Sequence, residues 1–227
     1  MTPKGFFITG TDTEVGKTVV ATALVRGFVA QGRRVAVMKP VASGSHHTPE
    51  GLRNEDALAL MRASNVAAPY ACVNPYCFEP AISPHIAAEE AGITVQLDPI
   101  RTSFDLLAAA SDLVIVEGAG GWLAPVGPDT SMKDLARALG LPVILVVGVR
   151  LGCINHALLT QLAIESQGIT FAGWIANTVD AAMPRRKENL ETLARGLGAP
   201  PLAIVPRQTP DSATLVLTEA ASQLLHS

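Results

Sequence analysis

The stretch GFFITGTDTEVGKT, residues 5–18, decides the fold class. An apolar run ends at Gly10, and the triplet Gly16, Lys17 and Thr18 opens a helix-compatible segment. A strand that leads through such a loop into a helix is typical of a phosphate-binding loop, in which N–H groups at the helix start bind phosphate. The alternative is a tight strand-to-helix turn that contains these residues without binding a nucleotide.

The loop differs from the usual pattern in two ways. Five residues separate Gly10 from Gly16, where the usual spacing is about four. Two of the five are acids, Asp12 and Glu14. Carboxylates repel polyphosphate, so the sequence raises the question of what these two side chains do.

The rest of the chain alternates short apolar runs with longer helix-compatible stretches, as expected of βαβ units around a parallel sheet. The predicted strands are 6–9, 34–38, 112–116, 142–147, 171–176 and 202–205. The predicted helices are 17–31, 54–62, 83–90, 102–110, 132–139, 155–167 and 185–197. Four glycines stand where these helices end: Gly32, Gly140, Gly168 and Gly198. The prediction is an α/β fold like that of phosphate-loop NTPases, with a largely parallel sheet flanked by helices on both faces.

We expect residues 1–227 to form a single domain, since the chain is too short for two well-packed ones. Residues 40–99 are less regular and are interpreted as an elaborated connection over the carboxyl ends of the strands, where open α/β sheets bind ligands.

Composition narrows the function. Apolar residues make up 48% of the chain, charged residues 16%, and the net charge is -3. This balance favours a globular protein and gives no electrostatic reason to expect nucleic acid or an anionic membrane as a partner. The longest apolar run, LPVILVVGV, is too short to span a membrane. The cysteines Cys72, Cys77 and Cys153 have neither disulfide nor zinc spacing and are expected to be reduced thiols in a cytoplasmic protein.

Two further motifs place charged side chains at strand ends. In VMKPVASGS, Lys39 follows a strand that Pro40 terminates, so it is a candidate catalytic cation, with Ser43 nearby. In DLVIVEGAGG, Glu117 ends a strand and precedes a glycine-rich run, as expected of a magnesium-associated carboxylate. The alternatives are a surface lysine at a strand end and a solvated glutamate in a glycine-rich turn.

Three other positions are more ambiguous. Asp56 fits either a metal ligand or a solvated acid in the first turn of a helix. In GVRLGCINHALLT the segment 152–155 leads into a helix start, which would suit a substrate carboxylate, although Asn155 and His156 fit capping roles equally well. Asn177 ends a strand, and its amide has the donor and acceptor needed to contact a purine edge.

Taken together, these motifs resemble the dethiobiotin synthetase family. The stretches that carry the resemblance are TGTDTEVGKT, KPVASGS, TPEGLRNEDALAL, VNPY, SPHIAA, VEGAGGW, LPVILVVGVRLGCINHALLT and AGWIAN, which span residues 8 to about 177. The resemblance implies an ATP- and Mg²⁺-dependent cyclo-ligase that converts 7,8-diaminononanoate and CO₂ into dethiobiotin, with ADP and phosphate as the other products. The intermediates would be a carbamate and a carbamic-phosphoric anhydride.

The resemblance also implies roles for individual residues. Lys17 and Lys39 would stabilise phosphoryl-transfer charge, and Thr18, Asp56 and Glu117 would surround Mg²⁺. The diamine or its carbamate would contact Thr13 and Ser43. The substrate carboxylate would meet the segment of a neighbouring subunit in a homodimer that comprises Leu151, Gly152, Cys153, Ile154 and Asn155. The implied ATP contacts are Glu14, Val15, Gly16, Lys17, Thr18, Val19, Asp56, Glu117, Gly118, Ala119, Gly120, Asn177, Thr178, Pro206, Arg207 and Gln208.

The sequence departs from the family at the predicted nucleotide-base contacts. The residue after the adenine-reading Asn177 is Thr178, where the family often has aspartate, and Pro206, Arg207 and Gln208 fit only loosely. These differences leave the selectivity for ATP over other nucleoside triphosphates open.

Two competing functions share the phosphate loop. One is a nucleotide-switch ATPase of the partitioning or positioning type, which commonly has an additional lysine early in the loop; this chain has Thr11 and Asp12 there. The other is a related amide-forming ligase. A diamine substrate would explain the two acids in the loop. We therefore expect Glu14 to contact an ammonium group and Asp12 to bind the loop's own backbone.

Overall fold

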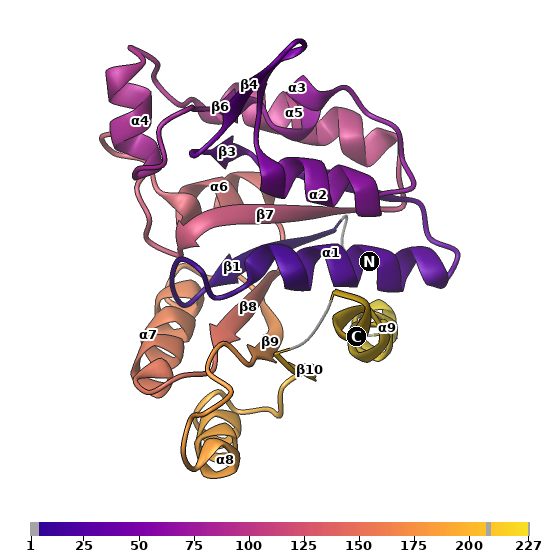
Figure 1. The fold of residues 1–227 in the computed structure, drawn as a ribbon, viewed down its shortest axis with the longest axis vertical. Helices are drawn as coiled ribbons and strands as arrows, with labels where there is room; N and C mark the ends of the chain where they lie inside the picture. The colour runs from indigo at the N-terminus through magenta and orange to yellow at the C-terminus, as the bar shows by residue number, and fades with distance from the viewer. Residues whose placement is uncertain (1–4, 208–209, 227) are drawn as a thin grey trace.

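A parallel sheet of six strands lies at the centre of the computed structural model, which describes residues 5–207 and 210–226 (Figure 1). Across the sheet the order is β10 (Ala203–Val205), β9 (Phe171–Asn177), β8 (Val143–Gly148), β1 (Gly5–Gly10), β7 (Leu113–Gly121) and β2 (Val35–Met38). All neighbouring strands in this sheet pair in parallel. The predicted fold class is confirmed, and each predicted strand appears in this one sheet.

Helices cover both faces of the sheet, which explains why its strands are apolar almost throughout. One face packs against α1 (Lys17–Ala30), α2 (Glu55–Ala63) and α9 (Pro210–His226). The other face packs against α5 (Leu97–Ala109), α6 (Met132–Leu139), α7 (Cys153–Glu165) and α8 (Arg186–Gly196). Along β1, Phe6 and Ile8 point to the α1 side, and Phe7 points to the opposite side.

The C-terminal helix α9 is a feature that the sequence analysis did not predict. It packs against α1 (Figure 1), and a Cβ atom at Gly27 would come within 3.1 Å of the Leu217 carbonyl oxygen. The two backbones can approach this closely because α1 has a glycine at the crossing. The Gln31 amide donates across the same contact to the Thr218 carbonyl at 2.9 Å.

The connection between β2 and β7 is more ordered than predicted. It contains the short strands β3 (Val41–Ala42), β4 (His46–Thr48), β5 (Gly51–Arg53) and β6 (Tyr76–Cys77), and the helices α3 (Tyr70–Val73) and α4 (Pro84–Glu90). β3 pairs with β6, and β4 forms a hairpin with β5. Helix α5 begins five residues earlier than predicted, because Pro99 lies in its first turn, where a missing N–H costs nothing.

The predicted helix ends agree better with the structure than the starts do. Gly32, Gly140, Gly168 and Gly198 all have positive φ angles, as expected at C-terminal caps. Helix α7, in contrast, starts at Cys153 with Gly152 as its N-cap, and Gly152 has a φ of 92°. The alternative in which Asn155 and His156 cap this helix is wrong, because both already lie inside it.

Candidate active site

The loop between β1 and α1 has the tight conformation expected of a phosphate-binding loop. Gly16 is the N-cap of α1 with a φ of 84°, and a Cβ atom there would lie 2.1 Å from Nδ2 of Asn177. Only glycine fits this position. The Asn177 amide donates to the Val15 carbonyl oxygen at 2.8 Å, so the end of β9 holds the loop in place. Glu14 is exposed and adopts a positive φ of 60° without being glycine.

Two lysines and two carboxylates meet beside this loop. The Nζ atom of Lys39 lies 2.6 Å from Oε1 of Glu117 and 3.1 Å from Oδ2 of Asp56. The Thr18 hydroxyl donates to the same Glu117 oxygen at 2.8 Å. These side chains come from the ends of β2 and from β7, α1 and α2. Asp56 is therefore part of the charged cluster and not only a solvated helix acid.

Burial and neighbouring charges shift the pKa values of this cluster. Desolvation disfavours the Lys39 ammonium, but Glu117 and Asp56 outweigh it and raise the Lys39 pKa above its usual value. Burial also opposes the charged form of Asp56, but the Lys39 ammonium lowers the pKa of that carboxyl. Among the described residues, no carboxylate pairs with the Lys17 Nζ, which donates instead to the Asp12 carbonyl oxygen. Desolvation by burial, followed by repulsion from Lys39, lowers the Lys17 pKa to about 8.

The cluster lies at a cavity of about 280 Å³ whose lining includes eleven of the predicted site residues. Its lining residues are Thr13, Glu14, Gly16, Lys17, Thr18, Lys39, Ala42, Ser43, Asp56, Glu117, Ala119 and Gly120. Of these, only Ala42 is not among the candidates drawn from the sequence. One site therefore brings together the phosphate-binding loop between β1 and α1 (the P-loop), the ends of β2 and β7, and the first turn of α2.

The oxygen atoms at this cavity suit a hard divalent cation. Glu117 is fully buried, and its Oε2 atom has no hydrogen-bond partner among the described residues. A buried carboxylate oxygen without a partner is costly unless a cation or water meets it. The described residues contain no group of three or more His, Cys, Asp and Glu that could hold a metal ion by themselves. Mg²⁺ does not need one, because it takes one or two carboxylates together with substrate phosphates and water.

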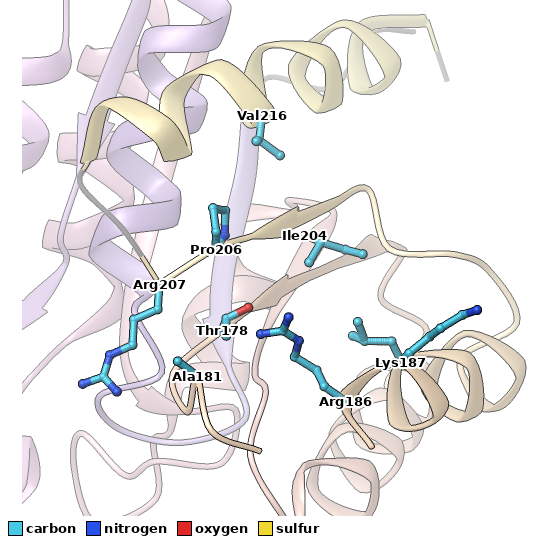
Figure 2. Close-up of a pocket in the computed structure, with 9 residues that line it drawn as sticks. Thr178, Ala181, Arg186, Lys187, Ile204, Pro206, Arg207 and Val216 are labelled. Atoms are coloured by element: carbon cyan, nitrogen blue, oxygen red, sulfur yellow. The ribbon is translucent and has the colours of Figure 1, made fainter. Parts of the chain in front are cut away.

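Other predicted nucleotide contacts line a second cavity, of about 700 Å³, next to the edge strand β10. Figure 2 shows Thr178, Pro206 and Arg207 among its lining residues, together with Arg186 and Ile204. The predicted base contacts Thr178, Pro206 and Arg207 thus lie together, next to the end of β9. Gln208 lies outside the described residues.

The remaining predicted ATP contacts are Val15, Val19, Gly118 and Gly120, and their surroundings differ. Val15 is buried in the core, and Val19 lies partly exposed in the first turn of α1. A Cβ atom at Gly118 would meet the Phe7 ring at 3.1 Å, so this glycine allows close packing against the core. Gly120 differs, since it lines the smaller cavity and has a φ of 62°.

Asp12 has the structural role expected for it, with an additional partner. Its Oδ1 atom accepts the backbone N–H of Thr13 at 2.8 Å. Its Oδ2 atom pairs with the Arg150 guanidinium, which lies just after β8. Arg150 is not among the residues predicted from the sequence, although a basic residue just after a central strand was a detectable signal. This ion pair links the phosphate loop to the segment that leads into α7.

The predicted carboxylate-binding segment, residues 151–155, does not line the 280 Å³ cavity of the same chain. It surrounds the start of α7, where Leu151 is 89% exposed and Cys153 is buried. Within one chain, the structure does not bring this segment together with Lys39 and Glu117.

Comparison with known proteins resolves the choice among nucleotide-binding families. A family model described as an AAA domain matches residues 4–213. An ATP-dependent dethiobiotin synthetase BioD from Pseudomonas paraeruginosa is 53% identical over 89% of this chain and 89% of its own length. The chain belongs to the dethiobiotin synthetase family. A second dethiobiotin synthetase, from Xanthomonas oryzae pv. oryzae, is 49% identical over 98% of this chain and 96% of its own length.

Solved structures show how widely the fold of the dethiobiotin synthetase family is shared. A MinC:MinD cell division protein complex from Aquifex aeolicus aligns over 99% of this chain and 96% of its own, with a TM-score of 0.63. Its sequence identity is only 14%, so the likeness concerns the fold alone. The sequence relatives therefore favour a synthetase over the switch ATPase considered above. Within the described residues, no helix of this family member is long and apolar enough to cross a membrane.

Proposed function

We propose that the protein is a dethiobiotin synthetase: it uses ATP, CO₂ and 7,8-diaminononanoate to close the cyclic urea of dethiobiotin, releasing ADP and phosphate. Family membership supports this activity. The structural observation that carries the proposal is the single cavity that joins a phosphate loop to a buried Lys39 and to the polar side chains of Thr13 and Ser43. Such a site can bring a nucleotide and a small polar substrate together.

The chemistry runs in three steps. One amine of the diamine adds to CO₂ and loses a proton, which gives a carbamate. A carbamate oxygen then attacks the γ-phosphorus of ATP, and ADP leaves. Finally the second amine attacks the carbamoyl carbon and loses a proton, the carbon–oxygen bond to the phosphoryl group breaks, and phosphate leaves with that oxygen.

Lys39 and Lys17 would act during the second step, in which negative charge moves between the nucleotide and the carbamate. Both ammonium groups lie in the water-poor cavity wall, where an electrostatic contact is stronger than in bulk water. Lys39 is oriented by two carboxylates, and Lys17 is fixed by the Asp12 carbonyl. Thr13 and Ser43 would orient the carbamate, and Glu14, which is exposed at the cavity, would attract an ammonium group of the diamine.

Mg²⁺ belongs to this proposal, with Thr18, Asp56 and Glu117 as the residues that would hold it. Their oxygens form a hard donor set, and the unpartnered Oε2 of Glu117 supports the assignment. When bound, Mg²⁺ would neutralise charge on the β- and γ-phosphates. The chain's contribution is to hold these oxygens next to the P-loop.

The base of ATP would lie over the ends of β9 and β10. The Asn177 side chain donates to Val15, so its Oδ1 atom is the acceptor that would meet the adenine amino group. Thr178, Pro206 and Arg207 would flank the base or ribose from the second cavity (Figure 2). Glu117, Gly118, Ala119 and Gly120 would lie against the phosphates from the end of β7.

A homodimer would complete the site. Residues 151–155 lie outside the cavity of their own chain, as they should if they bind the substrate carboxylate of a neighbouring subunit. Helix α7 also presents the exposed leucines Leu159 and Leu162, and Leu151 is exposed just before the helix begins; such apolar side chains suit a subunit contact.

The cellular setting and domain organisation complete the proposal. All three cysteines are free thiols, and ATP is the co-substrate; both points support a cytoplasmic enzyme. Since the six predicted strands form one sheet, we treat residues 1–227 as a single catalytic domain.

Product formation tests this function. Purified protein is incubated with the diamine, bicarbonate, ATP and Mg²⁺, and the products are separated and weighed by mass spectrometry. The expected result is a cyclic urea that depends on all four additions and is absent with Lys17→Ala. ATP hydrolysis stimulated by another protein, without any urea, would instead indicate a nucleotide switch.

A further inference from the structure

One phenol hydroxyl joins two segments of the active site that are far apart in sequence. The Tyr70 Oη atom accepts the backbone N–H of Asn54 at 2.8 Å and donates to Oδ1 of Asn74 at 2.9 Å. Asn54 precedes α2, and Asn74 follows the four-residue helix α3. Neither asparagine lines the cavity, and both are buried, with exposed fractions of 6% and 3%.

Asn74 connects the Tyr70 hydroxyl to the backbone of Lys39. Because its Oδ1 atom accepts from Tyr70, its Nδ2 atom must be the donor to the other neighbours. Nδ2 donates to the Lys39 carbonyl oxygen at 2.6 Å and to the Tyr76 carbonyl oxygen at 3.0 Å. The backbone at the end of β2 is therefore fixed in place directly behind the Lys39 side chain.

Asn54 connects the Tyr70 hydroxyl to the turn that carries Asp56. Its Oδ1 atom accepts the backbone N–H of Asp56 at 3.1 Å and that of Ala57 at 3.3 Å, which caps α2. Its Nδ2 atom donates to the Ser43 carbonyl oxygen at 3.3 Å. The hydroxyl of Tyr70 thus lies between the segment that carries Lys39 and the turn that carries Asp56.

The geometry points to Tyr70 as a positioning residue for the reaction. This inference rests on the proposed function and adds a residue to it. Tyr70 does not line the cavity, so it acts through the two asparagines. It fixes the distance between the Lys39 ammonium and the Asp56 carboxylate, which is 3.1 Å. Without the hydroxyl, the buried Asn54 N–H and Asn74 Oδ1 would both lose a partner. The segment that carries Lys39 and the turn that carries Asp56 would then be free to shift.

Tyr70→Phe is the direct test, since it removes one oxygen and keeps the ring that the Arg53 guanidinium covers at 4.2 Å. Tyr76→Phe is the matched control: the Tyr76 hydroxyl accepts the Gln96 N–H at 3.1 Å, on the same connection but away from the site. We expect Tyr70→Phe to lower kcat about tenfold, the effect of roughly one net hydrogen bond. The KM values for diamine and ATP should stay within about twofold, because the groups that bind them remain. The half-saturating Mg²⁺ concentration should rise.

Asn74→Asp separates positioning from general stability. It keeps the acceptor for Tyr70 but replaces the donor to Lys39, so its kcat should fall as well. The double variant should be no slower than the slower single variant, because both changes interrupt one path. All rates are measured at a temperature at which every variant is folded by circular dichroism. Multiplicative effects, or a kcat for Tyr70→Phe equal to that of Tyr76→Phe, would overturn the inference.

Hydrogen exchange gives a second readout that does not depend on the reaction. In the ligand-free protein, Tyr70→Phe should speed exchange of the amides of residues 54–57, and Tyr76→Phe should not. Unchanged exchange with Tyr70→Phe would refute the positioning role even if the enzyme makes the urea. If wild-type protein makes no urea while the exchange effect is present, the proposed function fails and the structural link stands.

Discussion

Lys39 Nζ lies 2.6 Å from Glu117 Oε1, and both side chains are almost completely buried. A buried carboxylate and ammonium at this distance hold each other charged and oriented. The same Glu117 oxygen accepts the Thr18 hydroxyl from the P-loop. One carboxylate therefore connects the candidate catalytic lysine to the nucleotide loop.

Replacing this lysine should affect catalysis more than nucleotide binding. We expect Lys39→Met to lower kcat at least about 100-fold, as loss of a transition-state electrostatic contact does. The Kd for ATP, measured by titration calorimetry, should change less than about threefold, because the P-loop is untouched. Since Met leaves Glu117 without its cation, Mg²⁺ should raise the Tm of this variant more than that of wild type. Equal losses of affinity and turnover would contradict the role.

Lys17 should take up a proton when ATP binds at alkaline pH. Its pKa is lowered to about 8 in the ligand-free protein, so it is largely neutral at pH 8.5. The triphosphate favours the charged form and raises that pKa, so binding at pH 8.5 should take up between about one half and one proton. At pH 6.5 Lys17 is already charged, and its contribution should vanish. Calorimetry in buffers of different ionisation enthalpy measures this uptake.

Lys17→Arg is the control for that measurement. Arginine keeps the positive charge but does not titrate in this range, so the Lys17-dependent uptake should be absent. The same uptake in Lys17→Arg would assign the proton to another group.

The two acids of the P-loop should behave differently. Glu14 is exposed at the cavity, whereas the Asp12 carboxylate is engaged by Thr13 and Arg150. Glu14→Gln should raise the KM for the diamine several-fold, and Asp12→Asn should instead lower thermal stability. Steady-state kinetics and thermal melting compare the two variants. An unchanged diamine KM and kcat in Glu14→Gln would remove the substrate role of Glu14.

The apolar surface of α7 should be needed for the dimer. Leu162 is 63% exposed, and Leu106, on α5, is 59% exposed, so it provides a control of the same type and exposure. Leu162→Glu should shift the protein toward monomer and raise the diamine KM, whereas Leu106→Glu should do neither. Analytical ultracentrifugation measures the first effect. A Leu162→Glu protein that stays dimeric, or a wild type that is monomeric, would contradict this contact.

The sequence predicts the parts of the fold that depend on local pattern. The strands of the sheet are apolar on both faces, and GFFITG followed by GKT is specific enough to predict the loop and helix that follow. Helix α9 was missed because its position depends on a distant contact, the close approach of α9 to Gly27 on α1. The short strands β3 and β6 were missed for the same reason, since each is only two residues long and exists because it pairs with the other.

The residues of the candidate site also divide into those that local sequence pattern predicts and those whose roles depend on distant contacts. Lys17, Thr18 and Lys39 follow from strand ends that must meet at one edge of a parallel sheet. Glu117 was expected to end its strand, but β7 continues past it to Gly121. The sequence alone does not place Asp56 in the charged cluster, because only folding brings its Oδ2 atom to 3.1 Å from the Lys39 Nζ atom. Arg150 and Tyr70 were not selected because their roles depend on partners far away in the sequence, Asp12 in one case and Asn54 and Asn74 in the other.

The fate of the CO₂ oxygens tests the central claim most directly. That claim is that the γ-phosphoryl group of ATP is transferred to a carbamate within one cavity. The reaction is started with freshly added ¹⁸O-labelled CO₂ and stopped within a single turnover, and the phosphate is analysed by mass spectrometry. The account predicts that each urea formed is accompanied by one phosphate carrying one ¹⁸O atom from CO₂. Urea accompanied by phosphate without that label would contradict it, because the phosphoryl group would then have passed to water and not to the carbamate.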